Sequence, residues 1–104
     1  MTQMRFFVDT HDRTRGTFPA EFSAKDFEAF FEEYEKACAA EGVVVLRLHL
    51  SIEEGRAFCF NMAPDADAVR RAHDRLNFPF DSITEVTTAT PGDIFFHRKS
   101  ALAA

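Results

Sequence analysis

The sequence predicts one α+β domain in which two helices lie against a four-stranded antiparallel sheet. Two segments combine a helix-capping residue with apolar positions at helical spacing, and four short segments are rich in strand-forming residues. Their order along the chain is strand, helix, strand, strand, helix, strand. At 104 residues the chain has the usual size of a single domain.

Four strands are expected, at residues 4–10, 43–51, 56–62 and 83–90. Each is short and rich in β-branched or aromatic residues. A loop at His11–Ala20 follows the first strand and is long for a compact domain.

Both helices have start and stop signals, and Asn77 can serve as the left-handed residue that ends the second helix. Ser23 and Asp26 have the spacing of a capping box, and Gly42 supplies the left-handed residue that ends the first helix. Asp65 caps the second helix, which we expect to run to about Leu76.

This element order predicts a ferredoxin-like βαββαβ plait. Two right-handed crossovers place the first and third strands in the centre of the sheet and both helices on one face. Residues 1–92 form the domain in this interpretation. Residues 93–104 form a C-terminal tail, whose apolar start at 94–96 is expected to pack on this domain or on a second copy.

Composition argues against several classes of partner. The net charge is -5 and the isoelectric point about 5.3, and an acidic surface repels nucleic acid. No apolar run reaches the length of a membrane span, and the N-terminus lacks the features of a signal peptide. The two cysteines do not suggest a disulfide framework, so we expect a cytoplasmic protein.

The alternation of side chains predicts which sheet face meets the helices. A three-residue turn at Glu53–Gly55 would place His49 opposite Cys59. The face expected beneath the helices is wholly apolar and comprises Met4, Phe6, Val8, Val44, Leu46, Leu48, Leu50, Phe58, Phe60 and Met62. The other face mixes apolar and polar residues: Arg5, Phe7, Asp9, Val43, Val45, Arg47, His49, Ser51, Ala57, Cys59 and Asn61. A mixed face of this kind is typical of a buried contact, so we expect a homodimer that uses the open sheet face.

The predicted pairing of His49 with Cys59 indicates a metal site. Cross-strand neighbours have Cβ atoms about 5 Å apart, and imidazole and thiolate both suit nickel, zinc and copper. Asp9 on the adjacent strand, or residues of a second subunit, would complete the ligand set. In the alternative interpretation His49 is an interface residue and Cys59 a small apolar filler.

His11 and His73 form a second candidate pair at the same pole of the fold, on the other side of the sheet from His49 and Cys59. The simpler interpretation is that both are solvated, with His73 stabilised by the dipole at its helix end. The chain has no Gly-x-Ser-x-Gly, phosphate-binding loop, His-Glu-x-x-His or Cys-x-x-Cys motif, so no catalytic signature of these kinds is present.

Several stretches resemble a family of small ferredoxin-fold proteins of largely unknown function, one branch of which is nickel-binding or nickel-responsive. The resemblance rests on Cys59–Asp65, Ala68–Arg75, Asn77–Pro79 and Ile83–Val86. It implies a dimer and a divalent metal such as nickel. It also places His49, Cys59 and His73 at recurrent positions of that family.

Three functions therefore remain open at the level of sequence. The first is a non-catalytic, cytoplasmic, metal-binding homodimer with His49, Cys59, His73, His11 and Asp9 as candidate ligands. The second is a small dimeric enzyme, such as a cofactor-poor oxygenase, with a pocket lined by phenylalanines and a histidine base. The third is an interaction module without a small ligand.

Overall fold

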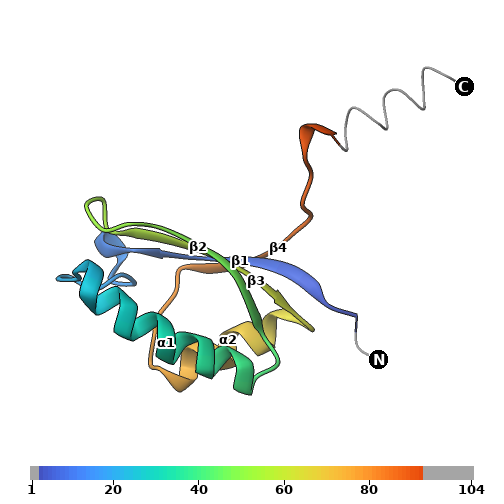
Figure 1. Ribbon diagram of the computed structural model, residues 1–104, viewed down its shortest axis with the longest axis horizontal. Helices are drawn as coiled ribbons and strands as arrows, with labels where there is room; N and C mark the ends of the chain where they lie inside the picture. The colour runs from blue at the N-terminus through green and yellow to red at the C-terminus, as the bar shows by residue number, and fades with distance from the viewer. Residues whose placement is uncertain (1–2, 93–104) are drawn as a thin grey trace, which may run out of the picture.

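The computed structural model describes residues 3–92 and confirms the ferredoxin-like plait (Figure 1). The elements are β1 (Arg5–Asp12), a short 3-10 helix η1 (Arg13–Arg15), α1 (Ala24–Ala40), β2 (Val44–Ser51), β3 (Arg56–Ala63), α2 (Ala66–Arg75) and β4 (Ser82–Val86). The sheet is antiparallel with the order β2-β3-β1-β4, so β1 and β3 are central as predicted. The predicted tail at residues 93–104 lies outside the described residues.

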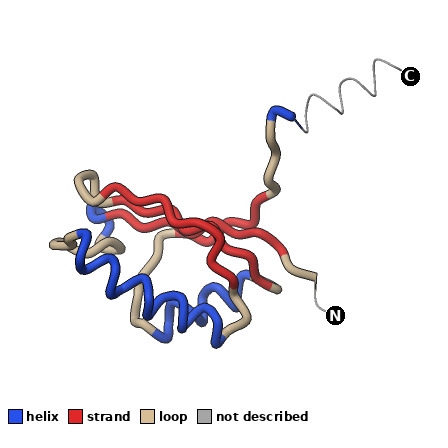
Figure 2. Tube along the Cα trace, in the orientation of Figure 1, coloured by secondary structure: helices blue, strands red, loops and turns tan. Residues whose placement is uncertain are grey.

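Both helices cover the same face of the sheet and leave the other face open (Figure 2). The β1 strand runs two residues beyond its predicted end, so His11 belongs to the strand rather than to the loop. The β4 strand is shorter than expected and ends at Val86. No helix in the described part of the chain is long and apolar enough to cross a membrane.

The capping box at the start of α1 forms as predicted. The Asp26 N–H donates to Ser23 Oγ at 3.1 Å, and the Ser23 N–H donates to Asp26 Oδ2 at 3.0 Å. Gly42 follows the helix with φ of 73° and turns the chain into β2. These local bonds fix where α1 begins and ends.

The α2 helix is capped and then tied to α1. Asp65 Oδ1 accepts the Ala68 N–H at 2.8 Å, as predicted from the sequence. Arg71 Nε and Arg75 Nε donate to the two carboxylate oxygens of Glu41 at 2.8 and 2.6 Å. Glu41 follows the last residue of α1, so these ion pairs hold the two helix C-termini together.

The predicted register of the β2–β3 hairpin is wrong by one residue. Four residues, not three, connect Ser51 to Arg56, and the Gly55 N–H donates to the Ser51 carbonyl at 2.8 Å. His49 therefore lies opposite Phe58, and Cys59 lies opposite Leu48. A bulge between Val45 and Arg47 shifts the pairing once more.

The predicted choice of face is also wrong for β1 and β3. Phe7, Asp9, Cys59, Asn61 and other residues of that alternation lie buried beneath the helices. Most of the apolar set expected there faces outward instead, and four of its members are exposed: Phe6, Val44, Leu46 and Phe58. Leu48 and Leu50 of β2 do lie on the helix-covered side as predicted, opposite Cys59 and Ala57. Small residues on β3, including Ala57 and Ala63, give the helices room to approach the sheet.

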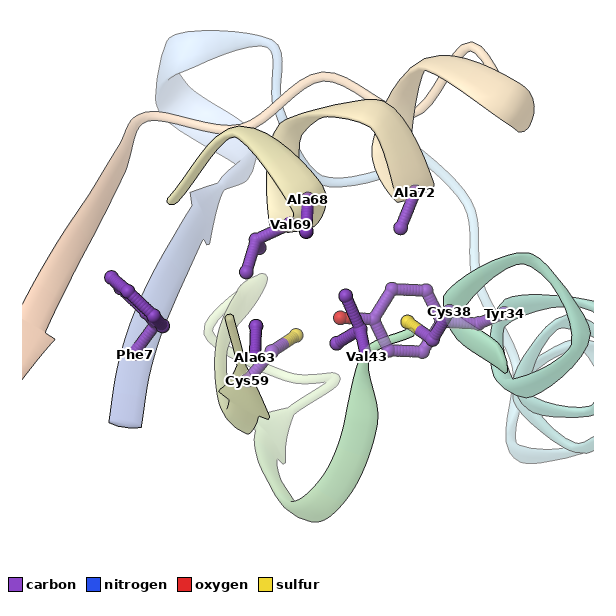
Figure 3. Packing of buried hydrophobic residues seen from close by; sticks show 9 residues of the cluster. All are labelled: Phe7, Tyr34, Cys38, Val43, Cys59, Ala63, Ala68, Val69 and Ala72. Carbon is purple, nitrogen blue, oxygen red and sulfur yellow. The ribbon is translucent and has the colours of Figure 1, made fainter. Parts of the chain in front are cut away.

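The core therefore lies between the helices and the sheet face that carries Phe7, Asp9 and Cys59. Tyr34 and Cys38 of α1 and Val69 and Ala72 of α2 pack against the sheet residue Phe7 and its neighbours (Figure 3). The Tyr34 ring points from α1 toward the sheet, with its hydroxyl directed to the side of Cys59 (Figure 3). Tyr34 thus places a hydroxyl group in the core between the helices and the sheet, within hydrogen-bond distance of Asn61.

We expect Ser23→Ala to lower the free energy of unfolding by about 1 kcal/mol, because the Asp26 N–H loses its acceptor. Ser23→Asp should retain most of the stability, since aspartate also serves as an N-cap. Urea unfolding followed by circular dichroism measures both variants. Equal stability of the alanine variant and the wild type would contradict the role given to this cap.

Candidate metal centre

Three titratable side chains meet beneath the helices. Asp9 and His11 are two residues apart on β1, so both project to the same face of the sheet. His73 comes from the last turn of α2 and reaches down to them. All three are fully buried.

Both histidine rings direct a nitrogen toward the same carboxylate oxygen of Asp9. His11 Nε2 lies 2.8 Å from Asp9 Oδ1, and His73 Nε2 lies 3.1 Å from it. The two rings are roughly parallel, with centroids 5.4 Å apart and an angle of 23° between their planes. One oxygen thus receives two imidazole nitrogens from separate elements of the fold.

The opposite nitrogen of each ring faces backbone carbonyls. His11 Nδ1 lies 2.8 Å from the Pro79 oxygen and 3.2 Å from the Thr17 oxygen. His73 Nδ1 lies 2.8 Å from the Val69 oxygen. A carbonyl oxygen only accepts hydrogen bonds, so each Nδ1 carries a proton and donates. This arrangement leaves Nε2 of both rings as the nitrogen able to bind a cation.

Asn61 and Tyr34 complete the polar cluster. Asn61 Nδ2 donates to Asp9 Oδ2 at 2.9 Å and to the Tyr34 hydroxyl oxygen at 3.2 Å. Asn61 Oδ1 is buried without a hydrogen-bond partner among the described residues. A buried amide oxygen without a partner is costly, so a further hydrogen-bond donor or a cation beside it would be stabilising.

Aromatic rings close the cluster on its remaining sides. Phe78 stacks on His11 with ring centroids 4.1 Å apart and planes 6° apart. Phe80 and Tyr34 pack with their planes inclined to the His73 ring, at centroid distances of 5.2 and 5.6 Å. These rings exclude water, so electrostatic interactions within the cluster are stronger than at the surface.

The buried cluster lowers the pKa of Asp9 and raises the pKa of His73. Burial acts to raise the pKa of Asp9, but the hydrogen bonds and positive charge of His11 and His73 outweigh it and lower the value. Burial acts to lower the pKa of His73, but its hydrogen bond to Asp9 and the Asp9 charge outweigh it and raise the value. Both shifts favour a charged carboxylate beside a charged imidazole.

His49 and Cys59 are not neighbours in the structure. His49 is exposed and lies opposite Phe58, whereas Cys59 is buried on the helix-covered face opposite Asp9 and Leu48. Burial, and then the charge of Asp9, raises the pKa of the Cys59 thiol well above its usual value. In the metal-free protein Cys59 is therefore a neutral thiol beside the cluster.

The donor set of the cluster fits a divalent transition metal. One ligand atom each from Asp9, His11 and His73 lies within 4.8 Å of the others. Imidazole nitrogens with a carboxylate oxygen are ligands for nickel, zinc, iron and copper. The backbone carbonyls that bind each Nδ1 proton are the outer partners usual for metal-binding histidines.

The pairing of His11 with His73 is predictable from the sequence, but the predicted place of Asp9 on the other face of the sheet is wrong. Asn61, Tyr34 and Phe78 are members of the cluster that the sequence does not reveal. The Asp-x-His alternation at residues 9–11 is a usable signal, since residues two apart on a strand share a face. It depends on His11 lying in the strand, whereas the sequence predicts a loop there.

The pKa shifts predict how the metal-free protein responds to pH. Because the pKa of His73 is higher in the folded state, its stabilisation is complete below about pH 6.5 and is lost as pH rises through the folded value. Because the pKa of Asp9 is lower in the folded state, its stabilisation is present above about pH 3.9 and is lost as pH falls. Maximal stability is therefore expected between these two limits.

Urea unfolding in the presence of a chelator, from about pH 5 to about pH 9, measures the expected fall in the free energy of unfolding as pH rises. His73→Gln should flatten it, whereas the exposed residue His49 offers a matched control in His49→Gln. Parallel pH profiles for the wild type and His73→Gln would contradict the pairing of His73 with Asp9.

Comparison with known proteins places the chain in a family. The family model for the nickel responsive protein SCO4226-like matches residues 7–86. The crystal structure of SCO4226 from Streptomyces coelicolor A3(2) has a TM-score of 0.69 and 22% identity, covering 82% of this chain and 99% of that one. At this identity the likeness to the solved structure shows a shared fold, and no curated protein matches the chain. The extent of the family match, over most of the domain, shows that this chain belongs to the SCO4226-like family of nickel responsive proteins.

Proposed function

We propose that this protein binds a divalent transition metal ion, nickel in the first instance, through Asp9, His11 and His73. The observation that carries the proposal is the convergence of three ligand atoms in a fully buried site whose imidazoles are both held with Nε2 inward. The choice of nickel is supported by the family description.

The protonation states of the metal-free cluster favour this function. With each Nδ1 donating to a carbonyl, a neutral ring turns the lone pair of Nε2 toward the negative Asp9 oxygen. If both rings are instead protonated, one carboxylate faces two buried positive charges, which is costly without water. A cation bound by His11 Nε2, His73 Nε2 and Asp9 would accept the lone pairs of both nitrogens and of the carboxylate. It would thereby remove the repulsion between them.

A non-catalytic role fits the surroundings of the cluster. The apolar cavity between α1 and the sheet is lined by none of Asp9, His11 and His73. No histidine, aspartate or glutamate lines it, so a molecule in that cavity would meet no general base. The oxygenase hypothesis needs such a base, and metal binding does not.

We also propose that the protein forms a homodimer through the open sheet face. The mixed face expected at the interface lies largely under the helices, whereas the open face carries exposed apolar side chains beside Arg47 and His49. Phe6, Val44, Leu46 and Phe58 are 36%, 45%, 39% and 36% exposed on it. An apolar sheet face of this kind is typical of an interface, and a symmetric dimer would cover it.

A cytoplasmic location is part of the proposal. Cys38 and Cys59 are both free and buried, a state that a reducing compartment maintains. Burial raises the pKa of the Cys38 thiol to about 11, so this residue is chemically unreactive at neutral pH.

Calorimetric titration with Ni²⁺, using protein purified without a histidine tag, tests the metal site. We expect one ion per chain, and a loss of affinity of roughly 100-fold or more in His11→Gln and in His73→Gln, since each removes one of three ligands. His49→Gln is the matched control and should bind as the wild type does. Circular dichroism of each variant separates loss of a ligand from loss of the fold.

Two results would contradict this assignment. One is Ni²⁺ binding no tighter than about 1 mM in the wild type, which corresponds to only about 4 kcal/mol. The other is Ni²⁺ binding that survives both histidine substitutions at His11 and His73. Binding of Zn²⁺ but not Ni²⁺ would keep the site and refute the choice of metal.

Light scattering coupled to size-exclusion chromatography tests the dimer. The wild type should have about twice the mass of the 11.8 kDa chain. Phe58→Glu should give a monomer, because it places a charge within the apolar face. Ala29→Glu, at an exposed position of α1, should remain dimeric. A monomeric wild type at high concentration would refute the dimer.

A further inference from the structure

An apolar cavity of about 70 Å³ lies between the start of α1, the segment before it, and the sheet beneath. Five phenylalanines line it, and every accessible atom of its wall is apolar. They are Phe18, Phe22, Phe27, Phe30 and Phe78. Neither the metal site nor the open sheet face accounts for this concentration of rings in one place.

The cavity follows from how these rings pack. Phe22 contacts Phe18, Phe27 and Phe30 edge to face, at centroid distances of 5.6, 6.2 and 6.1 Å and interplanar angles of 84°, 89° and 81°. Rings packed at right angles leave space that none of them fills. On the sheet side, Ala57 and Cys59 are too short to close the gap.

An empty space of this kind is unfavourable for the rings that line it. Each lining atom lacks dispersion contacts on one side, and no polar group is present to hold a water molecule. Engineered apolar cavities of about 150 Å³ stay dry and bind benzene. The present cavity is smaller but opens to the surface, so a ring can enter edge first without being fully enclosed.

We propose that this cavity is a binding site for a small uncharged aromatic molecule. The purely apolar wall excludes a charged ligand, because nothing in it would replace the water that a charge loses. The edge-to-face arrangement around Phe22 favours a flat ring, since an added ring continues the same packing. A natural ligand would place its aromatic end inside and any polar group at the mouth.

Phe78 connects this site to the polar cluster. One side of its ring belongs to the cavity wall, and the ring also stacks on His11 at 4.1 Å. A bound aromatic molecule therefore contacts the residue that closes the cluster. Signals of the His11 ring should respond to the ligand even though His11 itself does not line the cavity.

Titration of the metal-free protein with toluene, followed by two-dimensional NMR, tests the proposal. We expect saturable shifts at Ala57, Cys59 and Phe78 and in the His11 ring, with a millimolar Kd. Ala57→Leu fills the cavity and should raise Kd by about tenfold or more. Val44→Leu, on the open sheet face, is the matched control and should leave Kd unchanged.

Two results would overturn the proposal. They are toluene shifts that do not saturate, and shifts centred on Phe6 and Phe58 of the open face. If Ala57→Leu fails to fold, Leu50→Phe fills the same cavity from β2 and replaces it. Because no metal is present, a negative result here leaves the metal proposal intact, and the reverse also holds.

Discussion

The buried carboxylate of Asp9 is the constraint on which the rest of the structure depends. It lies in the central strand beneath both helices, where a charge without partners would cost several kcal/mol. His11, His73 and Asn61 satisfy its two oxygens from the same strand, from α2 and from β3. The position of α2 over the sheet and the register of β1 with β3 must both be correct for this network to form.

This constraint explains why the polar alternation of β1 lies inside and the apolar alternation outside. His11 and Asn61 both hydrogen-bond to Asp9, so as a group the three side chains tolerate burial that none would tolerate alone. The aromatic side chains of Phe6 and Phe58 are left on the open face, where they are available to a second copy. The proposed metal site and the proposed dimer surface are thus two consequences of which sheet face the helices cover.

Phenylalanines within the described residues contribute to three parts of the domain. Some enclose the polar cluster, some line the apolar cavity, and others cover the open face of the sheet. Phe78 belongs to the first two groups, so the cavity and the cluster share a wall. A chain of 104 residues with 13 phenylalanines thereby has more apolar surface than its core alone uses.

Local signals in the sequence determined the element order, the helix caps and the strand order. Ser23, Asp26 and Asp65 act within a few residues of themselves, so the sequence reveals them directly. The side of the sheet that the helices cover depends on contacts between distant segments. One extra turn residue before Arg56 moved His49 away from Cys59, and only the fold brought His73 onto Asp9. Alternation along a strand shows that two faces differ, but the buried face is the one whose polar groups find partners.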